Sequence, residues 1–365
     1  MAAAAIRLEA LTKRYPGATA DAVHELDLEM PAGEIVALVG PSGCGKTTTL
    51  KMINRLIEPT SGTIEINGRP ARDLPVHELR RGVGYVIQHT GLFPHRTVAG
   101  NIATVPRLLG WDKRRTRERV EELVDLVGLE RGMLDRYPAA LSGGQQQRVG
   151  VARALAADPP ILLMDEPYSA VDPIVRARLQ DELLDLQRRV HKTIVLVTHD
   201  VDEAIKLGDR VVILNVGGIL EQAGPPAELL ASPASAFVAD FLGEERGLKR
   251  LALLRVSDLT PGDGPVADIG ASAEVARAAM DRHHVDWFGV RDGQRLLGWQ
   301  WGADLDGTVR AEGVRPFRAV VRPSTTLRAT LDGIVGSLTN VAVVEDDDGT
   351  YRGMVRIDEI SERVR

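Results

Sequence analysis

The residues whose spacing points most clearly to chemistry stand at positions 40–47, where the sequence fits G-x-x-x-x-G-K-[ST]. Glycines in such a loop let backbone N–H groups reach phosphate oxygens, and the start of the next helix favours negative charge. We expect Lys46 to reach the β- and γ-phosphates of a nucleotide and the Thr47 hydroxyl to bind Mg²⁺. The residues expected to bind the nucleotide phosphates here are Gly40, Pro41, Ser42, Gly43, Cys44, Gly45, Lys46, Thr47 and Thr48.

Two adjacent carboxylates follow another apolar run. Residues 161–164 are typical of a buried strand, and Asp165 and Glu166 come directly after them. A phosphate-binding loop needs a metal-holding carboxylate at the end of a neighbouring strand. We therefore expect Asp165 to hold Mg²⁺ and Glu166 to polarise water as a general base. Alone, the pair could equally be a surface Asp-Glu, and the loop at 40–47 decides between these interpretations.

A third segment, residues 141–148, combines a helix start with two glycines. Ser142 is a preferred N-cap residue, so an ordinary capped helix is one explanation. That explanation leaves out Gly143 and Gly144, since each glycine lowers helix propensity by roughly 1 kcal/mol. Bare amides at a helix start favour an anion, and with Gln145 beside them we expect a second contact to the γ-phosphate.

These side chains require strands that end at one edge of a sheet. Short apolar runs predict strands buried in a parallel sheet at 34–39, 83–87, 161–164, 193–197 and 210–214. Amphipathic stretches between them, notably 173–190, indicate helices and therefore an α/β fold. Residues 64–66 with Asn67-Gly68 predict a hairpin in a small antiparallel region near the N-terminus. Residues 97–140 read as a helical insert without a strand, with helices at 97–109 and 114–127.

Composition bounds the remaining possibilities. A chain of 365 residues suggests about two domains, and 45 Lys and Arg against 51 Asp and Glu give a formal charge of −6. Nucleic acid is not expected as a partner, because phosphate neutralisation needs a basic surface. Cys44, the lone cysteine, excludes a disulfide framework and reads as a small filler inside the loop. Neither a membrane span nor a secretory signal is expected.

The pattern changes around residue 243. Residues 243–250 are charged and punctuated by glycine, which predicts a linker. Beyond it, 285–305 and 340–360 each read as strand, hairpin, strand and helix start, and helical stretches at 273–282 and 326–337 precede them. Two unrelated hairpins are the alternative to a duplication. The matching order over about twenty residues favours a duplication.

Residues 1 to about 242, with these motifs in this order, resemble the nucleotide-binding subunit of ATP-binding-cassette (ABC) transporters. The resemblance implies a P-loop NTPase cassette of RecA-like fold, with an antiparallel β subdomain and a helical subdomain at about 97–140. It identifies 40–47 as Walker A, 161–166 as Walker B with its catalytic base, and 169–172 as the D-loop. The cofactors it implies are ATP and Mg²⁺.

The resemblance also implies roles for single residues. Lys46, Glu166 and His199 are the implied catalytic residues, with His199 as the switch histidine. Gln88 is the implied Q-loop glutamine, which contacts ATP and joins Thr47 and Asp165 as a metal ligand. His199 and Gln88 each follow a strand, where a purely structural polar residue is the alternative.

Further implied contacts lie outside these motifs or in a second chain. Tyr15 stands where such proteins stack an aromatic ring on adenine, and a lone surface aromatic is the alternative. The implied signature residues, which contact ATP across a dimer, are Ser142, Gly143, Gly144 and Gln145. Asp172 is the implied D-loop residue.

Two such subunits pack head to tail in the family, so one chain holds half of each site. The resemblance therefore implies a second copy of the subunit as a partner. It also implies transmembrane permease subunits, which meet the helical insert at 97–140. The expected location is peripheral, on the cytoplasmic face of the cell membrane.

Sharper matches resemble the ATP-binding subunits of glycine betaine, carnitine, choline and proline importers. The matching segments are 51–62, 79–88, 91–95 and 101–106, with Trp111. None of these residues would touch the solute, so this inference is by kinship; a substrate-binding protein would reach the complex through the permease. The alternatives are an importer of another small solute, of amino acid or polyamine type, and a non-transport ABC ATPase. The short insert at 97–140 and the single Walker A argue against the latter.

Residues 251–365 resemble a degenerate pair of cystathionine-β-synthase-type (CBS) domains, an α+β module that regulates osmoprotectant importers. The nucleotide-binding versions place Thr or Ser three residues after a strand glycine and Asp three further on. Here Trp301 and Asp304 follow Gly298 in one repeat. In the other repeat Arg356 and Glu359 follow Gly353. These departures leave open whether a small ligand or ionic strength is sensed.

Overall fold

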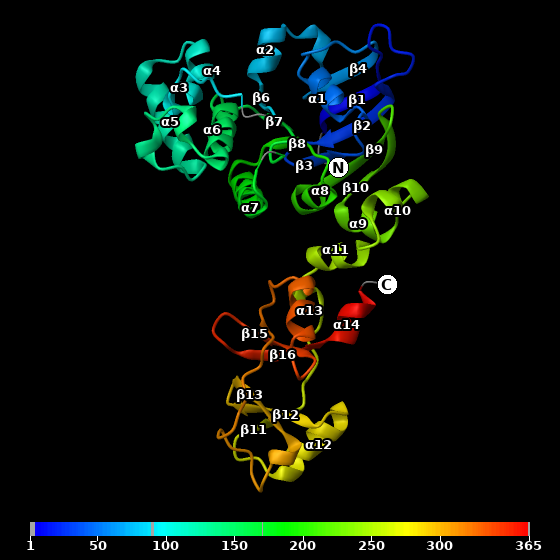
Figure 1. The fold of residues 1–365 in the computed structure, drawn as a ribbon, viewed down its shortest axis with the longest axis vertical. Coiled ribbons are helices and arrows are strands. Elements are labelled where there is room, and N and C mark those ends of the chain that lie inside the picture. The colour runs from blue at the N-terminus through cyan, green and yellow to red at the C-terminus, as the bar shows by residue number, and fades with distance from the viewer. Residues whose placement is uncertain (1–3, 89–90, 170, 364–365) are drawn as a thin grey trace. The chain divides into compact units, whose positions relative to one another are not determined.

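The computed structural model describes residues 4–88, 91–169 and 171–363, which form two compact units, Met1–Leu242 and Gly243–Arg365 (Figure 1). The first unit holds every motif considered above except those of the tail. Each unit has its own buried core. The change of pattern around residue 243 in the sequence coincides with the division between them.

The centre of the first unit is a six-stranded sheet in the order β10-β9-β3-β8-β7-β6. Its strands are β3 Ile35–Val39, β6 Val83–Val86, β7 Ile161–Asp165, β8 Thr193–Val197, β9 Arg210–Asn215 and β10 Ile219–Gly224. All pairs are parallel except β9 with β10. Every residue of β3, β7 and β8 is buried, which explains their continuous apolar runs. The α/β prediction is confirmed.

Alternate residues of the sheet feed two separate cores. In β7, Ile161 and Leu163 belong to the core shared with the N-terminal strands, whereas Leu162 and Met164 belong to the core shared with the helical region. This follows from the two-residue period of a strand. Helices beside the sheet are α1 Lys46–Ile53, α6 Gly143–Leu155, α7 Pro173–Val190, α8 Val201–Leu207, α9 Pro226–Ala231 and α10 Ala236–Leu242.

A second sheet of the first unit is antiparallel, in the order β2-β1-β4-β5. Its strands are β1 Ala4–Lys13, β2 Val23–Pro31, β4 Ser61–Ile66 and β5 Arg69–Pro70. The turn between β4 and β5 is Asn67-Gly68, with φ of 50° and 73°. Two positive φ angles are what a two-residue hairpin turn of the Asn-Gly kind requires. The predicted hairpin is therefore present.

Residues 97–140, all of which the structure describes, contain helices and 3₁₀ turns and no strand, as predicted. The helices are α3 Val98–Ile102, α4 Thr104–Leu108 and α5 Lys113–Leu126, with α2 Val76–Arg81 preceding β6. The single helix predicted at 97–109 is two short helices. Pro106 has no N–H to donate to the carbonyl four residues earlier, which explains why one regular helix does not form.

The second unit repeats one topology. Its first three-stranded sheet is made by β11 Val266–Asp268, β12 Trp287–Asp292 and β13 Arg295–Trp301, with α12 Ala273–His283 between β11 and β12. The second is made by β14 Val320–Val321, β15 Val341–Glu345 and β16 Tyr351–Arg356, with α13 Leu327–Val335 and then α14 Ile357–Glu362. In each sheet the first pair is parallel and the second antiparallel.

A glycine marks the same place in each repeat. Gly298 pairs with Val290 and Gly353 pairs with Val344, and the strand register shifts directly after both pairs. The φ angles are 153° and 141°, and an added Cβ would stand 2.2 Å and 2.8 Å from a backbone oxygen. Neither position has room for a side chain. The repetition extends from strand order to this detail and supports the duplication proposed from the sequence.

The linker predicted at 243–250 is not an irregular segment. Residues from Arg246 onward form helix α11, Arg246–Leu253, and Leu251 is fully buried in the core of the second unit. Charged residues and glycine suggested a linker, and Leu248 on the helix is indeed exposed, but Leu254 directly after the helix packs against the same core as Leu251. Burial of Leu251 and Leu254 fixes the segment as part of the second unit.

None of the helices in the described part of the chain is both long and apolar enough to cross a bilayer. Helix α7 has 18 residues, but Arg176, Asp181 and Arg188 are among its many charged positions.

Candidate nucleotide-binding site

A cavity of about 450 Å³ lies where β3, β7 and β8 end. Polar loops gather there because the carboxyl ends of neighbouring parallel strands meet at one edge of the sheet. Its lining residues are Ser42, Gly43, Cys44, Gly45, Lys46, Thr47, Thr48, Glu166 and His199. Residues from three motifs that lie far apart in the sequence are thus brought together.

Glycines shape the loop before α1. An added Cβ at Gly40 would stand 2.1 Å from the carbonyl oxygen of Leu214, and at Gly45 it would stand 2.4 Å from that of Ala22. The φ angles are 154° and 90°, which disfavour any other residue. Close approach of the backbone thus requires both glycines. By contrast, Gly43 meets nothing within 4 Å, so its surroundings are open.

Lys46 closes the loop on itself. Its Nζ donates to the carbonyl oxygens of Gly40 and Pro41 over 2.7 Å and 3.0 Å and lies 3.4 Å from Cys44 Sγ. The lysine is 7% exposed, and no carboxylate of the described residues lies within ion-pair distance of it. A buried ammonium without a counter-ion attracts an anion. Cys44 is fully buried in the core, which agrees with its interpretation as a filler.

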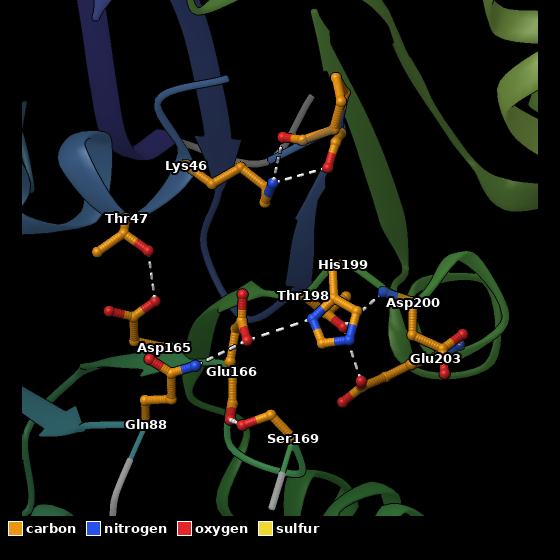
Figure 2. A network of polar contacts seen from close by, with 12 residues as sticks. Lys46, Thr47, Gln88, Asp165, Glu166, Ser169, Thr198, His199, Asp200 and Glu203 are labelled. Carbon is orange, nitrogen blue, oxygen red and sulfur yellow. Dashed lines mark hydrogen bonds and ion pairs between the residues drawn. The ribbon is translucent and has the colours of Figure 1, made fainter. Parts of the chain in front are cut away.

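Thr47 and Asp165 meet across the site. The Thr47 hydroxyl donates to Asp165 Oδ1 over 2.8 Å, and burial raises the pKa of the Asp165 carboxyl (Figure 2). One hydroxyl and one carboxylate are hard oxygen donors, and Mg²⁺ is bound by one or two carboxylates, waters and substrate phosphates. The described residues contain no group of three or more His, Cys, Asp or Glu side chains that could hold a metal ion by themselves. The donor set fits Mg²⁺ carried with a nucleotide.

Glu166 is held between two side chains. Its Oε2 accepts from Gln88 Nε2 over 3.0 Å and lies 3.2 Å from His199 Nδ1 (Figure 2). The residue has a φ of 43°, which is uncommon outside glycine and clusters at functional sites. The backbone N–H of Glu166 donates to the carbonyl oxygen of Val197, and the Ser169 hydroxyl donates to the carbonyl oxygen of Glu166. This backbone is therefore fixed from both sides.

The turn after β8 carries His199 and is itself fixed by Thr198, Asp200 and Glu203 (Figure 2). Sequence reasoning identified His199 and missed Glu203. Burial raises the pKa of Glu203 to about 7, against a hydrogen bond from Thr198 that lowers it. An acidic residue on the apolar face of a short helix was the signal available in the sequence, since ordinary amphipathic patterning places it outside.

Tyr15 stands beside the cavity. Its hydroxyl oxygen lies 3.4 Å from Thr48 Oγ1, and Lys13 Nζ lies 5.5 Å from the ring centroid. The side chain belongs to the exposed large hydrophobic residues, at 40% exposure. A half-exposed ring next to a phosphate loop is available for stacking on a base, as its predicted role requires.

The predicted signature does not line the cavity. Ser142 Oγ accepts from the N–H of Gln145, while Gln145 Oε1 accepts from the N–H of Ser142, so both side chains form a capping box at the start of α6. A Cβ on Gly144 would stand 3.0 Å from Val175 Cγ1, whereas one on Gly143 would meet nothing within 4 Å. Packing explains Gly144 and leaves Gly143 unexplained within this chain.

Asp172 also lies outside the cavity. Its Oδ1 accepts from the backbone N–H groups of Ile174 and Val175, and it is the N-cap of α7. The structure gives it a local role in this chain. Ala170, which the predicted D-loop includes, lies outside the described residues.

The tail positions that depart from the nucleotide-binding pattern have structural uses. Arg356 is the N-cap of α14, and its N–H donates to Glu359 Oε2 over 2.8 Å. Trp301 packs edge-on against Trp299, with centroids 4.9 Å apart. Arg356, Glu359 and Trp301 therefore each make a local contact within the tail.

Comparison with known proteins places this site in context. The sequence pattern of the ABC transporter family matches residues 23–169. The osmoprotectant import ATP-binding protein OsmV of Salmonella typhimurium is 47% identical over 98% of this chain and 95% of its own length. The glycine betaine/carnitine/choline transport ATP-binding protein OpuCA of Bacillus subtilis is 50% identical over 80% of this chain and 77% of its own.

Solved structures resemble the first unit. CbiO1 of Clostridium perfringens, part of the ABC transporter complex CbiONQ, matches with a TM-score of 0.60 and 26% identity. The match covers 68% of this chain and 95% of the CbiO1 chain. The ATP-binding cassette MJ0796, in a dimeric post-hydrolysis state bound to ADP and Pi, matches with a TM-score of 0.55 and 35% identity. The match covers 60% of this chain and 98% of the MJ0796 chain. The chain belongs to the ATP-binding subunits of ABC transporters, in the branch that contains the osmoprotectant importers.

Proposed function

We propose that this chain hydrolyses ATP on the cytoplasmic face of the cell membrane and thereby drives uptake of an osmoprotectant such as glycine betaine, carnitine, choline or proline. Partner transmembrane subunits would form the path, and a substrate-binding protein would deliver the solute to them. The observation that carries this proposal is the 47% identity to an osmoprotectant import protein, which extends over both units.

The nucleotide phosphates would bind in the cavity formed by the loop before α1. Among the described residues, the polar partners of the buried Lys46 ammonium are two carbonyl oxygens and a thiol, so a γ-phosphate would supply its counter-ion. Loop amides and the start of α1 add further attraction for negative charge. Thr47, Gln88 and Asp165 would hold Mg²⁺, which neutralises charge on the β- and γ-phosphates when bound.

Glu166 would act as the general base. It lines the cavity, and its carboxylate belongs to the end of β7 next to Asp165. A base that takes a proton from water must lie within hydrogen-bond reach of that water. His199 and Gln88 already contact its Oε2 and would orient the carboxylate and the attacking water.

Two copies of the chain would complete the two sites. The start of α6 is exposed at Ser142 and Gly143, and neither residue lines the cavity of its own chain. A helix start with bare amides suits the γ-phosphate held by a second copy. The dimeric state of the related cassette MJ0796 supports this arrangement.

The second unit would regulate the first. Its repeated strand and helix order, with Gly298 and Gly353 at equivalent places, supports the resemblance to paired CBS domains. We propose that it adjusts transport to ionic strength or to a small ligand. The capping role of Glu359 and the packing of Trp301 make an adenine nucleotide the less favoured ligand.

A transport assay tests the proposed solute. The chain, with the permease and binding protein encoded by neighbouring reading frames, is placed in proteoliposomes, and ATP-dependent uptake of labelled glycine betaine, choline, methionine and putrescine is compared. Uptake of the quaternary amines alone is expected. Uptake of methionine or putrescine with no quaternary amine uptake would contradict the solute class and leave the ATPase intact.

A further inference from the structure

Glu203 holds the residue that precedes His199. The Thr198 hydroxyl donates to Glu203 Oε2 over 2.7 Å and accepts from the N–H of Asp200 over 3.0 Å (Figure 2). Thr198 and Glu203 are 1% and 5% exposed. The backbone on one side of the histidine is therefore tied to a buried carboxylate in the first turn of α8.

Arg176 holds the residue that follows His199. Asp200 caps α8 with Oδ1, and its Oδ2 lies 3.6 Å from Nη1 of Arg176 on α7. Nη2 of the same arginine donates to the carbonyl oxygen of Val171 over 3.3 Å. Val171 belongs to the loop that leads into α7. Arg176 thus connects this loop to the turn that carries His199.

The cluster holds one spare donor and one spare acceptor. Arg176 Nε and Glu203 Oε1 are buried and have no hydrogen-bond partner among the described residues. An unsatisfied buried polar atom costs about 1–3 kcal/mol, and such atoms in a native structure call for an explanation. The two atoms are complementary and their side chains attract each other by charge.

We propose that Glu203 and Arg176 are positioning residues that set the place of His199 relative to Glu166. Glu203 acts through Thr198 on one side of the histidine, and Arg176 acts through Asp200 on the other. Because Arg176 also holds Val171, movement of the loop before α7 is passed to the histidine. The inference rests on the proposed role of His199 in hydrolysis.

Kinetics of the purified full-length chain test this proposal. Glu203→Ala removes the acceptor for Thr198, whereas Glu203→Gln keeps an oxygen at the same place. We expect Glu203→Ala to lower kcat about 10- to 100-fold, since small misplacements of catalytic groups cost this much. ATP affinity, measured with a fluorescent analogue, should stay within about twofold because Glu203 does not line the cavity. Glu203→Gln should recover most of kcat.

Arg176 provides a second variant with a matched control. Arg176→Ala should lower kcat without a change in ATP affinity. Arg178→Ala, two residues further along the same helix, removes an exposed arginine that pairs with Glu182 and should leave kcat unchanged. Equal losses in both arginine variants, or no rescue by Glu203→Gln, would overturn the positioning role.

A double-mutant cycle separates this inference from the function on which it rests. If Glu203 acts through the histidine, Glu203→Ala should have little further effect on the residual turnover of His199→Ala. Multiplicative losses would overturn the positioning role and leave the proposed function of His199 intact. An unchanged kcat in His199→Ala alone would instead overturn the role of His199, and the positioning role with it.

Discussion

His199 Nδ1 lies 3.2 Å from Glu166 Oε2, so the end of β8 contacts the end of β7 at the carboxylate best placed to act on water. Gln88 Nε2 donates to the same oxygen over 3.0 Å. The backbone of Glu166 adopts a φ of 43° and is fixed through Val197 and Ser169. The position of this carboxylate is thus determined by three separate segments of the chain.

Removing the histidine should affect catalysis more than binding. His199→Ala is expected to lower kcat about 100-fold, because the histidine would orient the Glu166 carboxylate and the attacking water, and misplaced catalytic groups cost about this much. ATP affinity should change little, since in the proposed site the loop at 40–47 would supply most phosphate contacts. Steady-state phosphate release and binding of a fluorescent ATP analogue measure the two quantities. A large loss of affinity at constant kcat would contradict this role.

Substitution of Gly143 tests whether this glycine is needed for folding or for ATP hydrolysis. An Ala at this position meets no heavy atom within 4 Å, and Gly→Ala in a helix stabilises by about 0.4–1 kcal/mol. Gly143→Ala should therefore keep or raise the Tm while ATPase activity falls at least about tenfold, since the methyl group obstructs amides that would face the partner's nucleotide. Thermal unfolding and phosphate release measure both.

A matched control for Gly143 is Gly132, where an added Cβ also meets nothing within 4 Å. Gly132 stands in a 3₁₀ turn of the helical region. Gly132→Ala should leave ATPase activity unchanged. Wild-type ATPase activity in Gly143→Ala would remove the reason for placing a second copy's nucleotide at this helix start.

Glu203 makes stability depend on pH. Burial raises its pKa to about 7 from an ordinary value of 4.5; the nearby Asp200 also raises it, whereas Thr198, Arg176 and His199 lower it. Between about pH 4.5 and 7 the folded chain keeps a proton that the unfolded chain has lost, so stability falls as pH rises through this window. Above about pH 7 the folded chain is destabilised by the full cost of ionising the buried Glu203 carboxyl.

The variant Glu203→Gln lacks this titration. Its free energy of unfolding, relative to wild type, should therefore increase between pH 5 and 8 by up to the order of 3 kcal/mol. Urea unfolding at the two pH values measures the difference, and comparison with wild type cancels groups common to both proteins. A difference that stays constant with pH would show that Glu203 is charged throughout.

Cys44 should be protected by the fold. Its side chain is fully buried against Lys46, so a thiol reagent reaches it only when the loop opens. We expect labelling at least about 100-fold slower in the folded chain than in urea, since opening of a core segment costs several kcal/mol. Rapid labelling of the folded chain with Ellman's reagent would contradict this burial.

The sequence predicted the central sheet well because its strands are buried on both faces and read as unbroken apolar runs. Of the site residues predicted at 40–48, 165–166 and 199, the cavity is lined by 42–48, Glu166 and His199, because each of these segments comes at the end of a strand. The tail was harder to read. β14 has two residues and β11 three, too few for a period to appear, and α11 is fixed by tertiary burial of Leu251.

Specific polar side-chain contacts could not be predicted from sequence, even where the partners lie close together in the chain. The sequence places Glu203 on the apolar face of α8, and only the fold shows that its buried carboxylate accepts from Thr198. The sequence predicted Ser142 as the N-cap residue of α6. It did not predict the hydrogen bond that the Ser142 N–H donates to Gln145 Oε1. Side-chain partners across the sheet depend on three-dimensional placement.

The proposed hydrolysis of ATP depends most on Glu166 as the base that activates water. In Glu166→Gln, the amide keeps the size of the side chain and cannot take a proton. The measurement is a single-turnover experiment with radiolabelled ATP and Mg²⁺, with the oligomeric state followed by size-exclusion chromatography. For Glu166→Gln we expect ATP affinity within about threefold of wild type and a stable ATP-bound dimer. Hydrolysis should be slowed at least about 100-fold. Hydrolysis at the wild-type rate would contradict this role of Glu166.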